Sequence, residues 1–578
     1  MHVVKVISRR GEAEYTSYLL RQSYREGAKV KKRTLANLSM LPLPVIQAIR
    51  RGLAGEELIA ASEALTITQS RAHGHVAAVL GTGQKLGLEA LVDPQPSRQR
   101  DLVLAMIAAR VLQPASKLAT TRLLDTTSLG QTLGLEDATE DDLYTAMDWL
   151  VARQERIEGR LAKRYLTPGG VVLYDLTSTY VEGEHCSLAK RGYSRDGKPG
   201  KQQIEFGMLT NGDGVPVAIE AFAGNTADPA TFQAQVHKVR ERFGVEEVIW
   251  VADRGMLTSA QVEKLQKVIG AHWVTALRAP TIQQLVQAGS VQLSLFDTQN
   301  LAEVTDPRYP GERLVVCHNP LLAEKRDRKR DDMLEATERE LAKVAAMAER
   351  GAAGGRAGLR GAAAIGERVG RVINKYQMAK HFTRTITDSS LTYARNEASI
   401  AREAALDGLY VLRTNVPQER LDTAAVVLTY KSLSHVEQAF RHFKLSNPSA
   451  AEGPIYHYRE ARVRAHLLVC LLAYWVQREM QQALAPLLFV DEAPPARPDP
   501  VAPAPRSERA LRKDRTHRTV EGHHVHSFRT LLATLGTLVK NRVVPHGGDQ
   551  RAAFDLLTQP TPLQQRAFDL LGLQLSRL

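Results

Sequence analysis

The sequence has few cysteines, and this excludes two classes of site. Three occur among 578 residues, Cys186, Cys317 and Cys470, and no two form a Cys-x-x-Cys pair. A disulfide framework or a zinc–cysteine site is therefore excluded, and a reducing compartment is expected.

Long apolar runs are also lacking. The longest, AHLLVCLLAYWV at 465–476, is far shorter than the roughly 20 residues of a membrane-spanning helix. It predicts a buried core helix instead. The apolar run near the N-terminus is too short for a signal peptide. Together these absences predict a cytoplasmic protein with no membrane partner.

Acidic residues are fewer than basic ones. There are 63 Asp and Glu against 76 Lys and Arg, a formal net charge of +13. The excess favours a polyanionic partner, nucleic acid first and an anionic membrane second. A basic but inert surface would give the same count, so charge alone does not decide between them.

From residue 169 onward, strand patterns alternate with helix patterns. The predicted elements are, in order, a strand at 169–183, a hairpin at 201–225, a helix at 228–244 with Asp228 as N-cap, a strand at 246–255, a helix at 258–270 and a strand at 272–278. This order is that of a ribonuclease H-like core, an α/β fold whose mixed sheet is flanked by helices. In such a sheet the first and fourth strands lie side by side.

Two aspartates interrupt this pattern, Asp175 inside the first strand and Asp253 at the end of the fourth. The predicted sheet makes them neighbours. A buried carboxylate costs several kcal/mol unless it is paired, protonated or bound to a cation, and Mg²⁺ suits a pair of carboxylates. For either residue alone, a structural role is favoured: a turn cap with Thr177, or an ion pair with Arg254. Both together favour a metal site.

The segment 428–447 offers a third acid. Polar residues spaced by seven, four and three fall on one helical stripe: Tyr430, Glu437, Arg441 and Lys444. The opposite stripe is apolar and would pack on the sheet: Leu433, Val436, Phe440 and Phe443. The alternative is a surface helix with an ordinary pair between Glu437 and Arg441.

These segments resemble the DDE transposases of bacterial insertion sequences, in the IS4-like group and closest to its IS1634-type family. The resemblance rests on YDLTSTYVEG, GNTAD (224–228), VADRGM (251–256) and the signature Y-x2-R-x3-E-x6-K, and it covers about residues 170–480. The signature begins at Tyr430, and Leu433 stands where the family usually has arginine. Arg441, one turn after Glu437, is the candidate substitute.

The resemblance implies a DNA transposase. Asp175, Asp253 and Glu437 would hold two Mg²⁺ (or Mn²⁺) ions for cleavage at the transposon ends and strand transfer into target DNA. Phosphate contacts near the site are expected from Tyr430, Arg254, Arg441 and Lys444. The implied partners are double-stranded DNA, both terminal inverted repeats and target, and a second copy of the chain in a synaptic homodimer. The location would be the bacterial cytoplasm, at the nucleoid.

Three rival functions stay open. A ribonuclease H-like nuclease would share the core but perform hydrolysis only. A catalytically inactive DNA-binding relative is favoured by Leu433 and opposed by the presence of all three carboxylates. A membrane-surface protein has only the basic charge in its favour.

The whole chain is predicted to have seven regions. They are an N-terminal β-hairpin region at 1–60 with candidate DNA contacts Arg9, Arg10, Lys31, Lys32 and Arg33; a helical region at 61–168; the first part of the core at 169–279; a β-containing insertion domain at 280–415; the Glu-bearing helix and the helix after it at 416–485; a Pro/Ala linker at 486–510; and a basic tail at 511–578. The insertion should contain strands at 291–297, 312–319 and 409–415 and a long charged helix at 321–350. The tail should contain an amphipathic helix at 527–543. Its histidines at 523, 524 and 526 indicate a solvated loop rather than a metal site.

Overall fold

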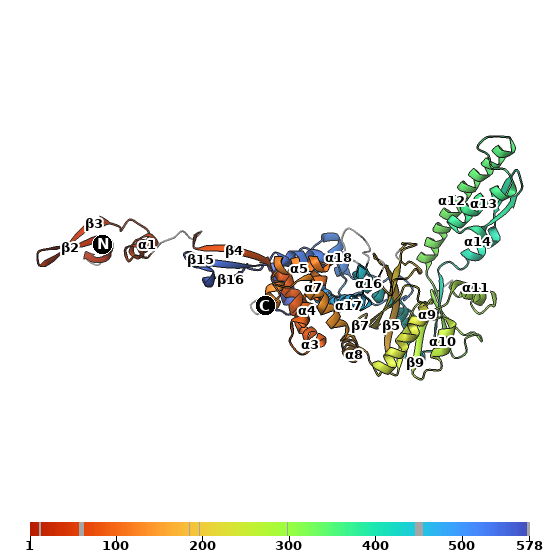
Figure 1. Ribbon diagram of the computed structural model, residues 1–578, viewed down its shortest axis with the longest axis horizontal. Coiled ribbons are helices and arrows are strands. Elements are labelled where there is room, and N and C mark those ends of the chain that lie inside the picture. Colours follow the sequence, from red (N-terminus) through yellow and green to blue (C-terminus); the bar gives the residue numbers. More distant parts are fainter. Residues whose placement is uncertain are drawn as a thin grey trace. The chain divides into compact units, whose positions relative to one another are not determined.

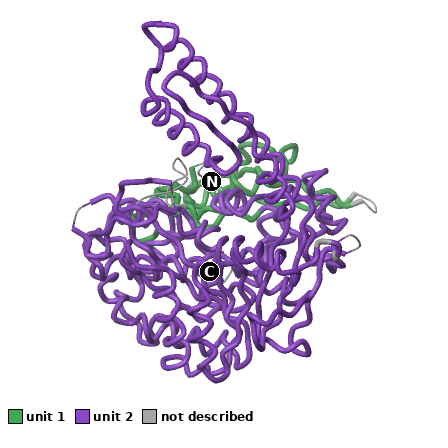
Figure 2. The backbone as a smooth tube through the Cα atoms, turned by 90° about the vertical axis from the view of Figure 1, so that its right-hand side faces the viewer, with its two compact units in different colours: residues 1–73, 537–560 green, residues 74–536, 561–578 purple. Residues whose placement is uncertain are grey.

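The computed structural model describes residues 1–10, 13–56, 63–183, 185–195, 197–296, 299–444 and 455–574 (Figure 1). Two compact units emerge from it (Figure 2). One comprises residues 1–73 and 537–560, and the other comprises residues 74–536 and 561–578.

The first unit begins with a three-stranded antiparallel sheet, one strand more than the predicted hairpin. Its elements are β1 (His2–Arg10), β2 (Ala13–Glu26), β3 (Lys29–Asn37) and helix α1 (Leu43–Leu53). Val3, Leu38 and Ile46 form a small buried core between the sheet and the helix. Strand β3 is exposed along its whole length, so the basic strand residues are accessible.

A second sheet in this unit joins distant parts of the chain. It has the order β16-β15-β4, with β4 (Leu65–Ala72), β15 (Val539–Pro545), β16 (Phe554–Leu557) and the short η6 (Gln550–Ala552). The predicted single helix at 527–543 is therefore wrong. Helix α19 (Phe528–Gly536) ends at a glycine, and the β-branched residues after it pair with β4 instead.

Helices dominate residues 74–166, but the region predicted to be helical at 61–168 also contains strand β4. The helices are α2 (Gly74–Lys85), α3 (Leu88–Val92), α4 (Arg98–Leu112), α5 (Lys117–Thr126), α6 (Leu129–Leu133), α7 (Glu140–Val151) and α8 (Gln154–Tyr165). Three of them, α2, α4 and α7, pack on α17 (Glu460–Ala483), the predicted core helix, whose apolar residues are buried. Within the described ranges no single helix could cross a membrane; α4 and α5, bent by 89°, pass that test only as a pair, by length and composition.

The centre of the second unit is an eight-stranded mixed sheet of order β10-β11-β14-β9-β8-β5-β6-β7. Its strands are β5 (Gly170–Tyr180), β6 (Gln203–Asn211), β7 (Pro216–Ala223), β8 (Val248–Val251), β9 (Ala271–Ala276), β10 (Leu301–Val304), β11 (Arg313–His318) and β14 (Leu409–Thr414). Strands β5, β8 and β9 are parallel, and the other pairs are antiparallel. The predicted neighbourhood of the first and fourth strands, β5 and β8, is confirmed.

Helices cover both faces of this sheet. They are α9 (Asp228–His237) with its π-helical continuation η2 (Lys238–Arg242), α10 (Ser259–Leu265), α11 (Ala279–Gln287), α15 (Thr423–Lys431) and α16 (Leu433–Lys444). Phe232 of α9 packs on Tyr174 and Trp250. On the other face, Phe440 of α16 packs on Phe206. Because side chains alternate along a strand, Asp175, next to Tyr174, faces α16.

The insertion differs from the prediction in two ways. Strands β10, β11 and β14 extend the central sheet rather than forming a separate one. The predicted strand at 291–297 is the 3₁₀ turn η3 (Leu293–Phe296), and its last residue lies outside the described ranges.

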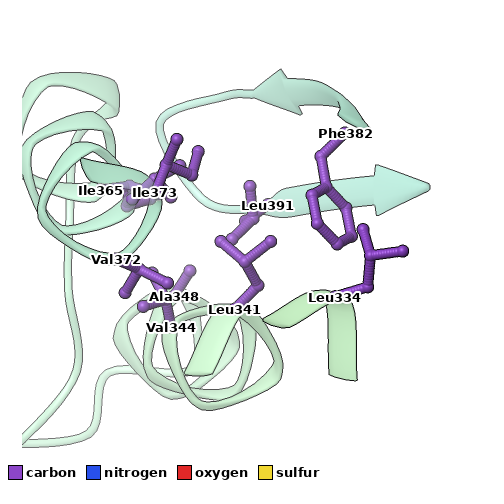
Figure 3. Close-up of a cluster of buried hydrophobic side chains, with 10 residues drawn as sticks. Leu334, Leu341, Val344, Ala348, Ile365, Val372, Ile373, Phe382 and Leu391 are labelled. Carbon is purple, nitrogen blue, oxygen red and sulfur yellow. The ribbon is translucent and has the colours of Figure 1, made fainter. Parts of the chain in front are cut away.

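The rest of the insertion is an arm that projects from the sheet (Figure 1). It contains α12 (Pro320–Ala352), α13 (Ala362–Tyr376), η4 (Ala379–His381), β12 (Phe382–Ile386), β13 (Leu391–Arg395) and α14 (Glu397–Ala404). The arm has its own apolar core, in which Leu341 of α12, Ile373 of α13 and Phe382 of β12 meet (Figure 3).

The Pro/Ala segment after the core is anchored near its middle. Its neighbouring elements are η5 (Ala485–Leu487), α18 (Glu508–Thr516) and α20 (Pro562–Leu571). Lys431 Nζ donates to the carbonyl oxygens of Pro500 and Val501 at 2.6 and 2.8 Å. The middle of the segment is therefore held against α15, which carries Lys431.

Candidate active site

Two aspartates lie near each other on adjacent parallel strands, Asp175 in the middle of β5 and Asp253 just past the end of β8. Leu173 of β5 is in register with Val251 of β8. Asp175 and Asp253 each lie two residues beyond this pair. Because neighbouring strands run about 4.8 Å apart, this register brings the backbones at Asp175 and Asp253 near each other where β8 ends beside β5.

Local hydrogen bonds orient both side chains. Asp253 lies past the end of β8 and is exposed, and its Oδ1 accepts from the N–H groups of Gly255 and Met256, both at 2.9 Å. Oδ1 of half-buried Asp175 accepts from Leu176 N at 2.8 Å. The carboxylate of Asp253 is thus held by a tight turn, and that of Asp175 by its own strand.

The third acid, Glu437, is exposed on α16. The predicted apolar stripe of this helix is confirmed, since Leu433, Val436, Phe440 and Phe443 are all buried. The end of the helix is held from α4, where Arg110 Nη2 donates to the carbonyl oxygen of Phe443 at 2.6 Å. Packing on the sheet and this hydrogen bond fix the direction of the helix that carries Glu437.

The three acids influence one another electrostatically. The pKa of Asp175 is raised to about 7, mainly by burial. The hydrogen bond from Leu176 N–H lowers it, the negative charges of Asp253 and Glu437 raise it further, and the positive charge of Arg195 opposes them. Three carboxylates far apart in sequence therefore share one electrostatic environment.

These acids supply only oxygen ligands, and a divalent cation between them would remove their mutual repulsion. The carboxylates are not drawn together into a closed cluster. In the described ranges, no three His, Cys, Asp or Glu side chains lie close enough to one another to hold a metal ion.

Tyr430 lies beside the acids but on a different helix from Glu437. The predicted single stripe is wrong at this point, because α15 ends at Lys431 and α16 begins at Leu433. The pKa of Tyr430 is raised to about 12, first by burial and then by the charge of Asp253. Its hydroxyl therefore stays protonated and can donate a hydrogen bond at neutral pH.

A groove of about 850 Å³ opens next to these residues. Asp253, Arg254 and Tyr430 line it on the core side, and Arg326 and Arg402 line it on the insertion side. Cations thus flank the acidic edge of the sheet, as a surface for DNA phosphates requires.

The other predicted DNA contacts are placed as follows. Arg441 is exposed and Lys444 half-buried on α16. In the first unit, Arg9, Lys31, Lys32 and Arg33 are exposed. Arg9 pairs with Glu14, and Lys31 with Glu26. The side chain of Arg10 lies outside the described part of the chain.

Sequence reasoning missed a second group of charged residues near the three acids. We call Arg195, Glu205 and Asp228 the second charged layer. Arg195 donates from Nη2 to Asp228 Oδ1 at 2.7 Å and from Nη1 to Glu205 Oε1 at 3.2 Å. Asp228 does not cap α9 as predicted; Ala227 holds that position, with no side-chain cap. The sequence signal that could have revealed this layer was the motif GNTAD. Its final residue is Asp228, whose carboxylate accepts a hydrogen bond from Arg195.

The second layer adjoins the first. A Cβ built at Gly255 would lie 3.2 Å from Oδ1 of Asp253 and 3.6 Å from Oδ2 of Asp228. The two carboxylates therefore flank the same glycine, and any side chain at Gly255 would crowd them. Burial raises the pKa of Glu205 to about 7, the charge of Arg195 lowers it and the charge of Asp228 raises it.

Known protein families match both the N-terminal region and the core. The model of the IS1634 family transposase, N-terminal domain, matches residues 3–64. The model of the transposase DDE domain matches residues 167–476, more than half of the chain. No curated protein matches the sequence. Among solved structures, the piggyBac transposase synaptic complex with hairpin DNA matches with 10% identity and a TM-score of 0.25, over 77% of this chain and 87% of that one.

Proposed function

Because the chain belongs to the DDE transposases of the IS1634 type, we propose that it cleaves DNA at transposon ends and joins the freed 3′-hydroxyl groups to target DNA, using two Mg²⁺ (or Mn²⁺) ions. The observation that carries the proposal is the register of β5 and β8, which puts Asp175 and Asp253 side by side beneath the helix of Glu437. The strand order β7-β6-β5-β8-β9 supports a ribonuclease H-like core.

Asp175, Asp253 and Glu437 are the proposed metal ligands, and they must be ionised to serve. The bound ions would stabilise negative charge on the attacking and leaving oxygens of an in-line displacement. The turn that holds Oδ1 of Asp253 fixes the direction in which the carboxylate points.

Neighbouring side chains would bind the DNA backbone. Tyr430 donates a neutral hydrogen bond, and Arg254, Arg441 and Lys444 donate charge-assisted ones. These contacts orient the scissile phosphate and hold it at the acidic edge, where its charge would otherwise be repelled.

We assign recognition of the terminal inverted repeats to the N-terminal sheet, whose exposed Arg9, Lys31, Lys32 and Arg33 would contact phosphates. Joining two ends requires two active sites, so the working form would be a synaptic homodimer on double-stranded DNA, in the bacterial cytoplasm at the nucleoid.

The test is a cleavage and joining assay with DNA carrying the element's terminal repeats. We expect Mg²⁺-dependent nicking at the repeat boundary, and joining of pre-cleaved 3′-hydroxyl ends to a target plasmid. Cleavage without joining would favour a hydrolytic nuclease. Binding to the repeats with neither reaction would favour an inactive DNA-binding relative.

The pH dependence of cleavage should follow the raised pKa of Asp175. Without metal this carboxyl is half-protonated near pH 7, and metal binding requires it to lose the proton. At subsaturating Mg²⁺, cleavage should fall about tenfold per pH unit below that point, and more Mg²⁺ should shift the midpoint to lower pH. A profile that is flat from pH 6 to 8 at low Mg²⁺ would contradict this.

The same pKa predicts the stability of the metal-free protein. The folded state holds the Asp175 proton more tightly than the unfolded chain does. The contribution of this group to stability is therefore full below the ordinary pKa of 3.8 and is lost as the pH rises through about 7. Melting curves of wild type and Asp175→Asn across this range should converge at low pH.

A further inference from the structure

The connection between β5 and β6 forms a basic surface that the mechanism above does not use. We call residues 185–195 and 197–202 the basic loop. Five Lys or Arg occur between 190 and 201, against one acid. The exposed members are Lys190, Arg191, Lys198 and Lys201. Among them stands Tyr193, whose side chain is 77% exposed.

The basic loop is anchored to the strands of the core. Lys190 and Gln203 exchange two backbone hydrogen bonds, at 3.0 and 2.8 Å. Gly192 packs directly on a neighbouring loop, since a Cβ there would lie 1.8 Å from the carbonyl oxygen of Gly224. The backbone that leads into Tyr193 is thus held against the core.

Arg195 ties the loop to the second charged layer. Its backbone N–H donates to Ser178 Oγ at 3.1 Å, and its guanidinium bonds Asp228 and Glu205. The guanidinium carbon also lies 5.9 Å from the centre of the Tyr193 ring. The Tyr193 ring is therefore exposed to solvent next to Arg195, which is itself held by Ser178, Asp228 and Glu205.

The same interactions place the basic loop next to the proposed active site. Asp228 flanks Gly255 together with Asp253, and the charge of Arg195 acts on Asp175. A DNA strand bound at the acids would pass this loop within a few nucleotides of the scissile phosphate.

We propose that the basic loop binds the DNA strand adjoining the scissile phosphate, with Tyr193 stacked on a base and Lys190, Arg191 and Lys198 on phosphates. An exposed aromatic ring among cations is the arrangement that binds unpaired nucleotides. The inference rests on the proposed function, which brings a DNA strand to this edge. The strand is either that of the transposon end or that of the target.

The experiment uses full-length protein carrying Asp253→Asn, so that binding is read without cleavage. 2-Aminopurine replaces one base at a time on either side of the cleavage site in end DNA, and at the joining site in target DNA. Stacking on Tyr193 should quench the fluorescence at one position. Tyr193→Phe should keep the quenching, whereas Tyr193→Ala should lose it and bind about tenfold more weakly.

Charge is tested separately with the triple variant Lys190→Ala, Arg191→Ala, Lys198→Ala. The slope of log affinity against log salt should become shallower by about 0.7 for each phosphate of unpaired DNA that the variant no longer neutralises. Lys267→Ala is the matched control. It is an exposed lysine next to the start of β9, where Ala271 pairs with Val248, at the end of the sheet opposite the acids. Its slope should fall by less than one third of the change seen for the triple variant.

Quenching in end DNA alone, or in target DNA alone, supports the inference and identifies the strand. The inference is overturned if Tyr193→Ala changes neither fluorescence nor affinity with either DNA while wild type still cleaves ends. If wild type fails to cleave or join but the quenching persists, the proposed function fails and the loop remains a DNA-binding surface.

Discussion

Asp175→Asn is expected to reduce transposon-end cleavage about a thousandfold or more, the usual size for loss of a group that acts on the transition state. The amide keeps the shape of the carboxyl but cannot carry the charge that a divalent ion needs. Binding to the terminal repeats should be largely unchanged, because Arg9, Lys31 and Lys32 lie on the N-terminal sheet. Cleavage rates and gel-shift affinities measured on one preparation check both parts.

The stability of this variant separates catalysis from folding. Asp175 is half-buried and repelled by two like charges, so its neutral replacement should melt at or above the wild-type temperature at pH 8 without metal. A variant that is inactive because it is unfolded would melt lower. Normal cleavage by Asp175→Asn with Mg²⁺ would show that Asp175 is not a metal ligand of the active site. Asp253→Asn and Glu437→Gln should behave alike in cleavage.

Lys238→Met is expected to destabilise the second unit by about 3–5 kcal/mol, the cost of leaving a buried charge without its partner. Lys238 Nζ lies 2.5 Å from Glu220 Oε2 and 3.3 Å from Glu158 Oε2. Glu158 is fully buried on α8, and burial raises its pKa while the charge of Lys238 lowers it. These ion pairs join α8 to β7 and to the helix after it. Urea unfolding at pH 7.5 should show the loss.

A second variant shows whether charge or packing is responsible. Glu158→Gln combined with Lys238→Met removes both charges of the buried pair and should recover a large part of the stability. Arg242, the other cation near Glu158, lies at 3.7 Å and is one-third exposed. Arg242→Met should therefore cost much less than Lys238→Met. If Lys238→Met and Arg242→Met lost equal amounts of unfolding free energy, the burial of the Glu158–Lys238 pair would not be the cause of the destabilisation.

The core of the fold could be predicted from local patterns. Strands β5, β6 and β7 and the apolar stripe of α16 lie where alternation and helical spacing put them, because burial of one face imposes those periods. The neighbourhood of β5 and β8 followed from element order. The two aspartates could be singled out because burying a carboxylate in an apolar strand costs free energy unless the carboxylate is paired, protonated or bound to a cation.

Features that depend on distant contacts were not predictable. The pattern at 539–545 suits a helix or a strand, and pairing with β4, more than 450 residues earlier, decides for the strand. The strands of the insertion join the central sheet because β14 pairs with β9, and no local signal specifies that edge. The break between Lys431 and Leu433 likewise separates two helices that pack on different elements.

The amino-acid sequence by itself determined the composition of the acidic site, the order of strands that carries it and the family to which the chain belongs, since these depend on residue type and local spacing. Only the tertiary structure decided that Arg195 links Glu205 to Asp228, and that the ring of Tyr193 lies exposed beside Arg195. The reason is physical: partners of charged side chains are chosen by distance in space, and the distances come from packing that brings loop, strand and helix to one edge of the sheet.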